Sequence, residues 1–155
     1  MKKKLGFLLL FLLLNFGALG LGSFLMGGNP AENEWYQNLP RAPWTPPGYV
    51  FGLAWSSIMI CFSILMAHLV TTSTWQLYIR IYAIQWLLNV LWNPLFFQLH
   101  MIVASLFVIT CLLMVLVWLG FALSKRESSL WNLLLLPYVL WLIVAISLNA
   151  YPVFN

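Results

Sequence analysis

Charged side chains are nearly absent from this sequence. Only 6% of its 155 residues are Asp, Glu, Lys or Arg, whereas 63% are hydrophobic and 17% are aromatic. A water-soluble domain of this size cannot cover its surface with so few polar groups. The composition therefore excludes a soluble globular domain and indicates a protein that is surrounded by lipid.

Acidic residues are the scarcest of the charges, and none of them lies inside an apolar run. Glu32, Glu34 and Glu127 all fall in the breaks between runs. Proton-coupled pumps and ion channels normally need ionisable groups within the membrane, and common acid–base catalysis needs paired carboxylates. Both classes of function are disfavoured, and we expect no catalytic acid or base.

Clustered metal ligands and basic patches are lacking as well. Cys61 and Cys111 each lie within an apolar run. His68 and His100 are expected at opposite membrane faces, about 30 Å apart, so one metal ion or haem iron cannot use both. We therefore predict no metal site. The Lys and Arg residues are scattered between the apolar runs, which argues against nucleic acid as a partner.

Long apolar runs take up most of the chain. The windows that could cross a hydrocarbon core of about 30 Å are residues 5–26, 48–70, 77–99, 101–123 and 130–152. Because a backbone in lipid must satisfy its own hydrogen bonds, helices are the expected form. We predict an all-α membrane protein, a five-transmembrane-helix bundle in a single domain that spans residues 1–155. The first window also resembles a cleavable signal peptide, but its length favours a retained helix.

The few basic residues predict how the protein is oriented. If the windows alternate in direction, one membrane face carries six of them, Lys2, Lys3, Lys4, Arg80, Lys125 and Arg126, and the other carries only Arg41. Basic residues gather on the cytoplasmic side of membrane proteins. We therefore expect a multi-pass integral protein of a bacterial cell membrane, with its N-terminus in the cytoplasm and its C-terminus on the opposite side.

One long connection, residues 27–47, joins the first two windows. It contains Trp35 and Trp44, and its second half carries four prolines, Pro40, Pro43, Pro46 and Pro47. Prolines restrict the backbone, and tryptophans favour burial. Loops of this length in compact domains are commonly lids or binding segments. We expect a long ordered loop that caps one end of the bundle.

Amide and aromatic side chains recur at helical spacing in three of the windows. These stripes are Gln85, Asn89, Trp92, Asn93 and Phe96; Tyr138, Trp141, Ala145, Leu148 and Asn149; and Phe51, Trp55, Met59 and Phe62. Amides in lipid need partners, water or a ligand, although bonding between helices would also satisfy them. Aromatic stripes can also be plain packing or lipid-facing belts. We interpret the three stripes as an apolar pocket for a flat hydrophobic ligand such as a porphyrin.

The same residues carry a family resemblance. The segment from Trp35 to Trp55, with Trp-Thr-Pro-Pro at residues 44–47, resembles the signature of the tryptophan-rich sensory protein family, TspO, also called translocator protein or peripheral benzodiazepine receptor. The resemblance continues through residues 89–97 and 136–149. It implies a five-helix bundle, usually a homodimer, that binds protoporphyrin IX or haem under the first loop as a ligand, with no required cofactor.

Ligand-binding residues also follow from the resemblance. The cavity positions of the family correspond to Tyr36, Pro46, Phe51, Trp55, Asn93, Phe96, Trp141 and Ala145. To these the capping loop and the polar stripe add Trp44 and Asn89. A small-residue pair on the first window, Ala18 and Gly22, would suit a helix–helix interface, but such pairs are common in membrane helices.

Three functions fit this site. The first is a tetrapyrrole sensor or scavenger in stress and porphyrin homeostasis, the second a porphyrin transporter, and the third an enzyme that degrades protoporphyrin with light and oxygen. We favour the first, because the sequence predicts a pocket and a lid but shows no inverted repeat for transport. In the photochemical alternative, Trp55 and Trp141 would supply oxidisable indoles beside the ligand, which would itself provide the reactivity.

Overall fold

Helices form all the regular secondary structure of residues 2–155, which the computed structural model describes. The long helices are α1 (Lys2–Leu25), α3 (Gly48–Leu69), α4 (Trp75–Phe97), α5 (Ile102–Arg126) and α6 (Leu136–Phe154). Between α1 and α3 lie the 3₁₀ helix η1 (Pro30–Glu32) and the short helix α2 (Glu34–Asn38), and η2 (Ser129–Leu134) precedes α6. The predicted all-α class is confirmed.

The long helices are suited to lipid. Four of them, α1, α3, α5 and α6, are long and apolar enough to cross a membrane. Many of their large apolar side chains are exposed, such as Leu13, Phe107 and Leu140, which is expected where the solvent is hydrocarbon. The chain is thus a multi-pass membrane protein. α4 has a similar length but carries Arg80 and several amides, and it is not among these four candidates, so the predicted fifth crossing is not confirmed.

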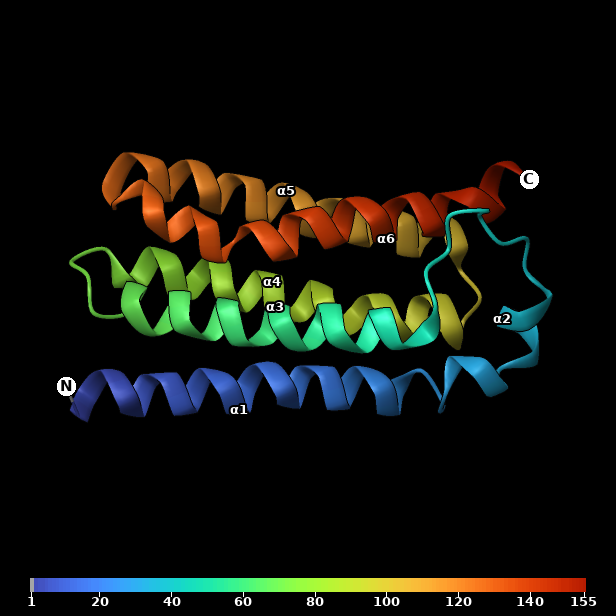
Figure 1. Cartoon of the computed structure of the whole chain (residues 1–155), viewed down its shortest axis with the longest axis horizontal. Helices are drawn as coiled ribbons and strands as arrows, with labels where there is room; N and C mark the ends of the chain where they lie inside the picture. Colours follow the sequence, from blue (N-terminus) through green and yellow to red (C-terminus); the bar gives the residue numbers. More distant parts are fainter. Residues whose placement is uncertain (1) are drawn as a thin grey trace.

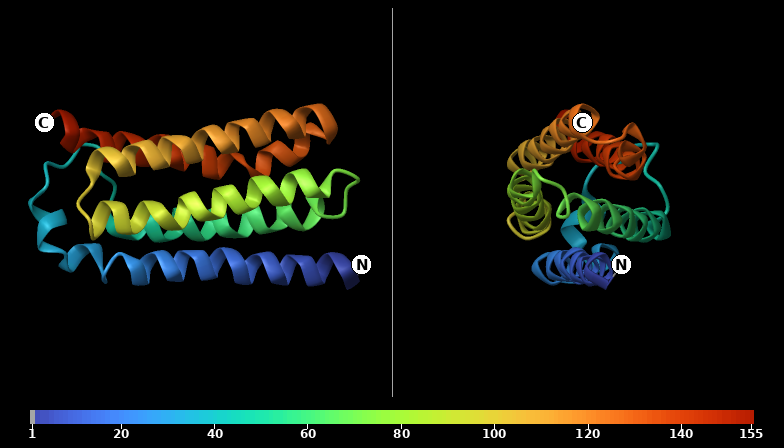
Figure 2. Two further views of the ribbon diagram at one scale, coloured as in Figure 1. Left: turned by 180° about the vertical axis from the view of Figure 1, so that it is seen from behind. Right: turned by 90° about the vertical axis from the view of Figure 1, so that its left-hand side faces the viewer.

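The long helices form a closed ring. Each of them packs against two neighbours, in the order α1, α4, α5, α6, α3 and back to α1, and the view along the ring axis in Figure 2 shows this arrangement. The two termini lie at opposite ends of the molecule (Figure 1). α3 and α4 follow each other in the chain but hardly touch, so the ring order differs from the chain order.

Hydrogen bonds tie α4 to α6 across the ring at two levels. Gln85 Nε2 donates to Tyr138 Oη over 2.8 Å. Farther along both helices, Trp92 Nε1 donates to Asn149 Oδ1, also over 2.8 Å. α4 and α6 are not neighbours in the ring, so these bonds mark where side chains from opposite walls meet in the interior.

A second set of buried polar groups joins α1 to its two neighbours. Tyr82 Oη donates to Asn15 Oδ1 over 2.9 Å, and Asn15 Nδ2 donates to Ser63 Oγ over 2.8 Å. The Ser63 hydroxyl in turn donates to the Met59 carbonyl. Because all three side chains are buried, this chain satisfies polar groups that would otherwise be costly in lipid. It links α4, α1 and α3.

The small-residue pair on α1 is used inside the chain. A Cβ atom at Gly22 would lie 2.6 Å from Asn93 Nδ2, so the missing side chain makes room for an amide of α4. Ala18, one turn earlier, is only 2% exposed. This pair therefore packs within one molecule and offers no surface to a second copy.

The last predicted window is divided into two elements. The other windows lie within three residues of α1, α3, α4 and α5, but residues 130–152 do not form one helix. Ser129–Leu134 form η2, and α6 begins at Leu136 with Pro137 in its first turn. Proline suits the first turn, where its missing N–H is not needed, but it cannot continue a helix from the preceding turn. The expected start at residue 130 is corrected accordingly.

Candidate ligand-binding site

The connection between α1 and α3 folds over one end of the ring. Its two short helices are stabilised locally, because Asn29 Oδ1 accepts a bond from the Ala31 N–H and Asn33 Oδ1 accepts one from the Tyr36 N–H, each over 3.0 Å. Asn33 Nδ2 also donates to the Phe97 carbonyl of α4, over 3.4 Å. Asn33, the residue that caps α2, therefore also attaches it to the bundle.

Aromatic contacts hold α2 against the end of α4. The Trp35 indole stacks on the His100 ring at 4.1 Å between centroids and meets Phe96 edge-on at 5.4 Å. Tyr36 lies 5.2 Å from the Phe97 ring and 6.1 Å from that of Phe96. His100 has φ 54°, a left-handed conformation that costs free energy in a residue other than glycine. Two predicted site residues, Tyr36 and Phe96, meet here.

Trp44 lies apart from these contacts. It is 57% exposed, its Nε1 donates to Ser147 Oγ over 3.1 Å, and its ring meets Tyr151 edge-on at 5.7 Å. Both partners belong to α6. Trp44 thus attaches the loop to α6. Pro46, another predicted site residue, is half-buried and lies two residues before α3 begins at Gly48.

Inside the ring, α3 and α6 bring together four further predicted residues. Phe51 meets Trp141 edge-on at 5.2 Å, and Trp55 meets Tyr138 edge-on at 5.9 Å. Ala145, one turn beyond Trp141, is half-buried against the same core. Among the described residues, no group accepts a hydrogen bond from the buried Trp141 Nε1. The site therefore contains an unused indole donor on a ring that packs against Phe51.

The polar stripe of α4 divides between two directions. Gln85 reaches α6 and Asn89 is buried, whereas the Asn93 amide donates to the Asn89 carbonyl over 3.1 Å and lies against Gly22 of α1. At about 100° per residue, Asn93 is rotated by about 80° from Gln85 around the helix. This rotation brings it to the side of the α1 neighbour. The amide of Asn93 therefore does not join the interior cluster that we expected.

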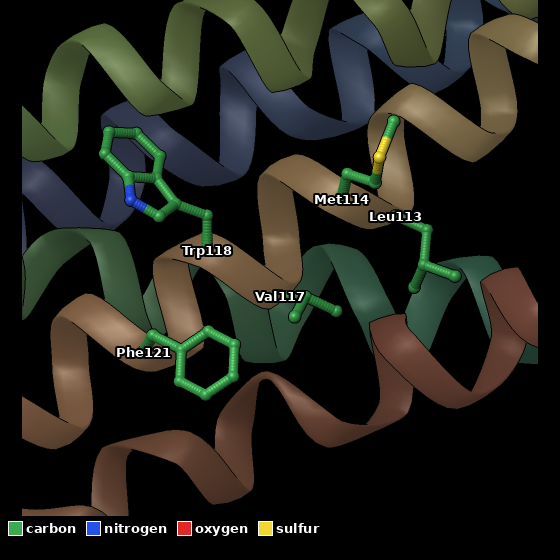
Figure 3. A pocket seen from close by; sticks show the side chains of 5 residues that line it. All are labelled: Leu113, Met114, Val117, Trp118 and Phe121. Carbon is green, nitrogen blue, oxygen red and sulfur yellow. The ribbon is translucent and has the colours of Figure 1, made fainter.

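Two hollows lie on the lateral surface of the bundle. One, of about 390 Å³, lies on the outer face of α5 and is lined by Leu113, Met114, Val117, Trp118 and Phe121 (Figure 3). The other, of about 240 Å³, lies between α3 and α6 and is lined by Ala54, Ser57, Pro137, Leu140, Trp141 and Val144. Only the second includes a predicted ligand-binding residue, Trp141. We call it the α3–α6 groove.

A cluster at the other end of the ring was not expected from the sequence. His68 stacks on Trp131 of η2 at 3.8 Å between centroids, and its Nε2 lies 3.4 Å from Glu127 Oε2. The two histidines therefore lie at opposite ends, each stacked on a tryptophan. The spacing of these residues along the chain gives no signal for such contacts, because His68 lies in α3, Trp131 lies in η2 and Glu127 follows the end of α5.

Comparison with known proteins identifies a family. A family model described as TspO/MBR family matches residues 8–154. The chain is 34% identical over 127 residues to protein CrtK of Rhodobacter capsulatus, which covers 77% of this chain and 76% of that protein. Over 121 residues it is 31% identical to the tryptophan-rich sensory protein of Cereibacter sphaeroides, covering 76% and 73% of the two chains. Tryptophan-rich protein TspO of Chlorobaculum tepidum is 30% identical over 128 residues, covering 77% and 78%.

Proposed function

The chain belongs to the TspO/MBR family, and from this premise we propose that it binds a tetrapyrrole such as protoporphyrin IX or haem inside the helix ring, beneath the cap formed by α2. In this proposal the protein acts as a sensor or scavenger of porphyrins. Binding, rather than catalysis, is the primary activity, because the surrounding side chains supply aromatic rings and amides but no catalytic acid or base.

The unused indole N–H of Trp141 is the observation that carries this proposal. A buried donor without an acceptor costs about 1–3 kcal/mol, and such groups call for a functional explanation. A tetrapyrrole with propionate groups offers carboxylate acceptors to this donor, and its flat apolar face suits the rings of Phe51 and Trp55, which lie beside Trp141 and Tyr138.

Ligand binding would then be coupled to the cap. The interior is filled by the contacts of Phe51 with Trp141 and of Trp55 with Tyr138, so a flat ligand must separate these rings. Phe96 connects this interior to the cap, since it stacks on Trp92 at 5.5 Å and also contacts Trp35. A ligand that binds the separated arrangement more tightly shifts the population toward it, and the cap would report occupancy to a partner.

Light-dependent degradation of protoporphyrin is a second candidate. It is supported by the contacts of Trp55 with Tyr138 and of Trp141 with Phe51, since both indoles then pack at the contact between α3 and α6. In this reaction the bound porphyrin would supply the photochemistry and the protein the oxidisable groups. The two candidates differ in one observable: faster bleaching of bound than of free porphyrin under illumination.

We also propose that α4 crosses the membrane with the other four long helices. Its length of 23 residues is sufficient, and its amides Gln85, Asn89 and Asn93 lie in the ring or against α1 rather than toward lipid. A homodimer, expected from the family, would then use a surface other than the pair Ala18 and Gly22.

A protoporphyrin IX titration of the detergent-purified protein, followed by quenching of tryptophan fluorescence, tests the proposal. We expect saturable quenching in the wild type and a Kd raised about tenfold in Trp141→Phe, since losing one hydrogen bond of about 1.4 kcal/mol has this effect. Trp118→Phe is the matched control, because Trp118 lies on the outer face of α5, and its Kd should equal that of the wild type. Absence of saturable quenching in the wild type, or an unchanged Kd in Trp141→Phe, would contradict the proposal.

A further inference from the structure

The α3–α6 groove opens at the depth of the hydrocarbon core. Ala54 and Ser57 lie six and nine residues after the first residue of α3, which is about 9 and 14 Å along the helix axis. Leu140, on the opposite wall, is 58% exposed. The mouth of the groove therefore faces acyl chains rather than water.

The walls of the groove suit an apolar molecule. Ala54, Pro137, Leu140 and Val144 contribute only hydrocarbon to its lining. The one hydroxyl, that of Ser57, donates to the Leu53 carbonyl of its own helix over 2.8 Å, so its proton is already used. A molecule dissolved in the bilayer would lose no hydrogen bond with water on moving into this space.

Trp141 belongs both to the groove and to the packed core. Trp141 lines the groove, yet it is largely buried, and its ring meets that of Phe51 edge-on at 5.2 Å. Its Nε1 is the donor without a partner described above. A rotation of this indole would therefore connect the lipid-facing groove directly with the proposed binding site.

The size and packing of the groove suit a passage. Its volume of about 240 Å³ is below the range of roughly 300–1,000 Å³ that is usual for sites that enclose a drug-sized ligand. The interface between α3 and α6 is also the most sparsely packed of the five helix–helix interfaces around the ring. The side chains on the α3 wall, Ala54 and Ser57, are small, which leaves room beside the larger residues of α6. The hollow on α5, by contrast, is lined by one helix and reaches no interior residue of the site.

We propose that the α3–α6 groove is a lateral entrance through which a flat apolar ligand passes from the bilayer to the interior site, with the Trp141 indole as its gate. This inference rests on the proposed function and adds the route by which the ligand arrives. Access from the side means that the cap formed by α2 need not open, so the contacts of Trp35 and Tyr36 can persist while the ligand enters.

Blocking the groove after folding tests this route. Both native cysteines, Cys61 and Cys111, are unpaired. They are first replaced by alanine so that they do not react with the label, and Ser57→Cys is then added to this variant. The purified protein in lipid nanodiscs is compared before and after labelling with a bulky apolar maleimide. The rate of tryptophan quenching is then measured on mixing with vesicles that carry protoporphyrin IX. Val117→Cys, labelled in the same way, is the matched control on the outer hollow of α5.

We expect the label on Ser57→Cys to slow association by at least about tenfold, within the range by which such rates vary among related complexes. The Kd should change much less, because a blocked passage slows arrival and departure alike. An unchanged rate after labelling, or equal slowing by the label on Val117→Cys, would overturn the lateral entrance while leaving the proposed function intact. If the unlabelled proteins show no saturable quenching, the proposed function itself fails, and the entrance with it.

Discussion

Gly22 determines how closely α1 approaches α4. The space that a side chain would occupy there is filled by the amide of Asn93. Gly20, on the same helix, has open space around the corresponding position. These two glycines therefore differ in packing although they are alike in helix propensity, which makes them a matched pair for measuring what the close approach contributes.

We predict that Gly22→Ala is less stable than Gly20→Ala by about 1–3 kcal/mol, because a methyl group at residue 22 forces the Asn93 amide out of its place. Both changes gain helix propensity equally, so the difference between them isolates the contact. Unfolding of the detergent-solubilised protein by SDS, followed by circular dichroism, measures it. Equal stability of the two variants would show that the amide moves aside without cost.

Gly27 shows what a single residue can and cannot reveal from sequence. The run Gly-Gly-Asn-Pro predicts a break after the first window, and Gly27 has φ 82°, as a turn of this kind requires. The second reason for glycine at this position is tertiary, because a side chain there would collide with the Gln98 amide at the end of α4. No local pattern could have predicted that contact.

At the scale of elements, the cap depends on a few aromatic contacts. α2 has only five residues, too few for an isolated helix to be stable in water. Its position therefore relies on Trp35, which stacks on His100 and meets Phe96, and on the bond from Asn33 to the Phe97 carbonyl. Removal of one of these contacts should open the cap without unfolding the ring.

We predict that Trp35→Ala increases the rate of hydrogen exchange of backbone amides in residues 29–47 by about tenfold. An aromatic pair stabilises the packed arrangement by about 0.5–1.5 kcal/mol, and its loss lowers the free energy of opening the cap by this amount. Mass spectrometry of the exchanged protein in detergent measures this increase. Trp75→Ala is the control, because Trp75 is an exposed residue at the first turn of α4, at the opposite end of that helix. If both variants exchange alike in residues 29–47, Trp35 does not hold the cap.

At the scale of the whole molecule, the ring has two ends with different charges. Lys3 and Lys4 begin α1 and Lys125 and Arg126 end α5, whereas Arg41 lies in the connection that caps the other end. The N- and C-termini lie at these two opposite ends (Figure 1). With the positive-inside rule, this arrangement predicts a cytoplasmic N-terminus and a C-terminus on the other side.

Reporter fusions check this orientation. We expect alkaline phosphatase fused after Asn155 to be active, because it would reach the side opposite the cytoplasm. A fluorescent protein that is exported unfolded should remain dark at the same position. The same reporters fused in the α5–α6 connection, after Glu127, should show the reverse pattern. An inactive phosphatase at the C-terminus would mean an inverted bundle or an even number of crossings.

How much the sequence determined can be judged from particular residues. The apolar runs determined the helices, because a backbone in lipid has no water to satisfy its polar groups. Helical spacing was enough to select Phe51, Trp55 and Trp141 as candidates, since residues of one face that lie at similar depth come close when their helices pack. The local signal of Pro137 was also present in the sequence, but its effect on the start of α6 became clear only from the structure.

The tertiary structure alone decided which neighbour each face meets. The order of helices in the ring turned Asn93 toward α1, used Gly22 within the chain and placed Trp44 against α6 rather than in the interior. It also brought His68 to Trp131 and left the Trp141 indole N–H without a partner. The physical reason is that in lipid several helix arrangements bury similar apolar surface, so the choice among them rests on close packing and on hydrogen bonds between residues far apart in the chain.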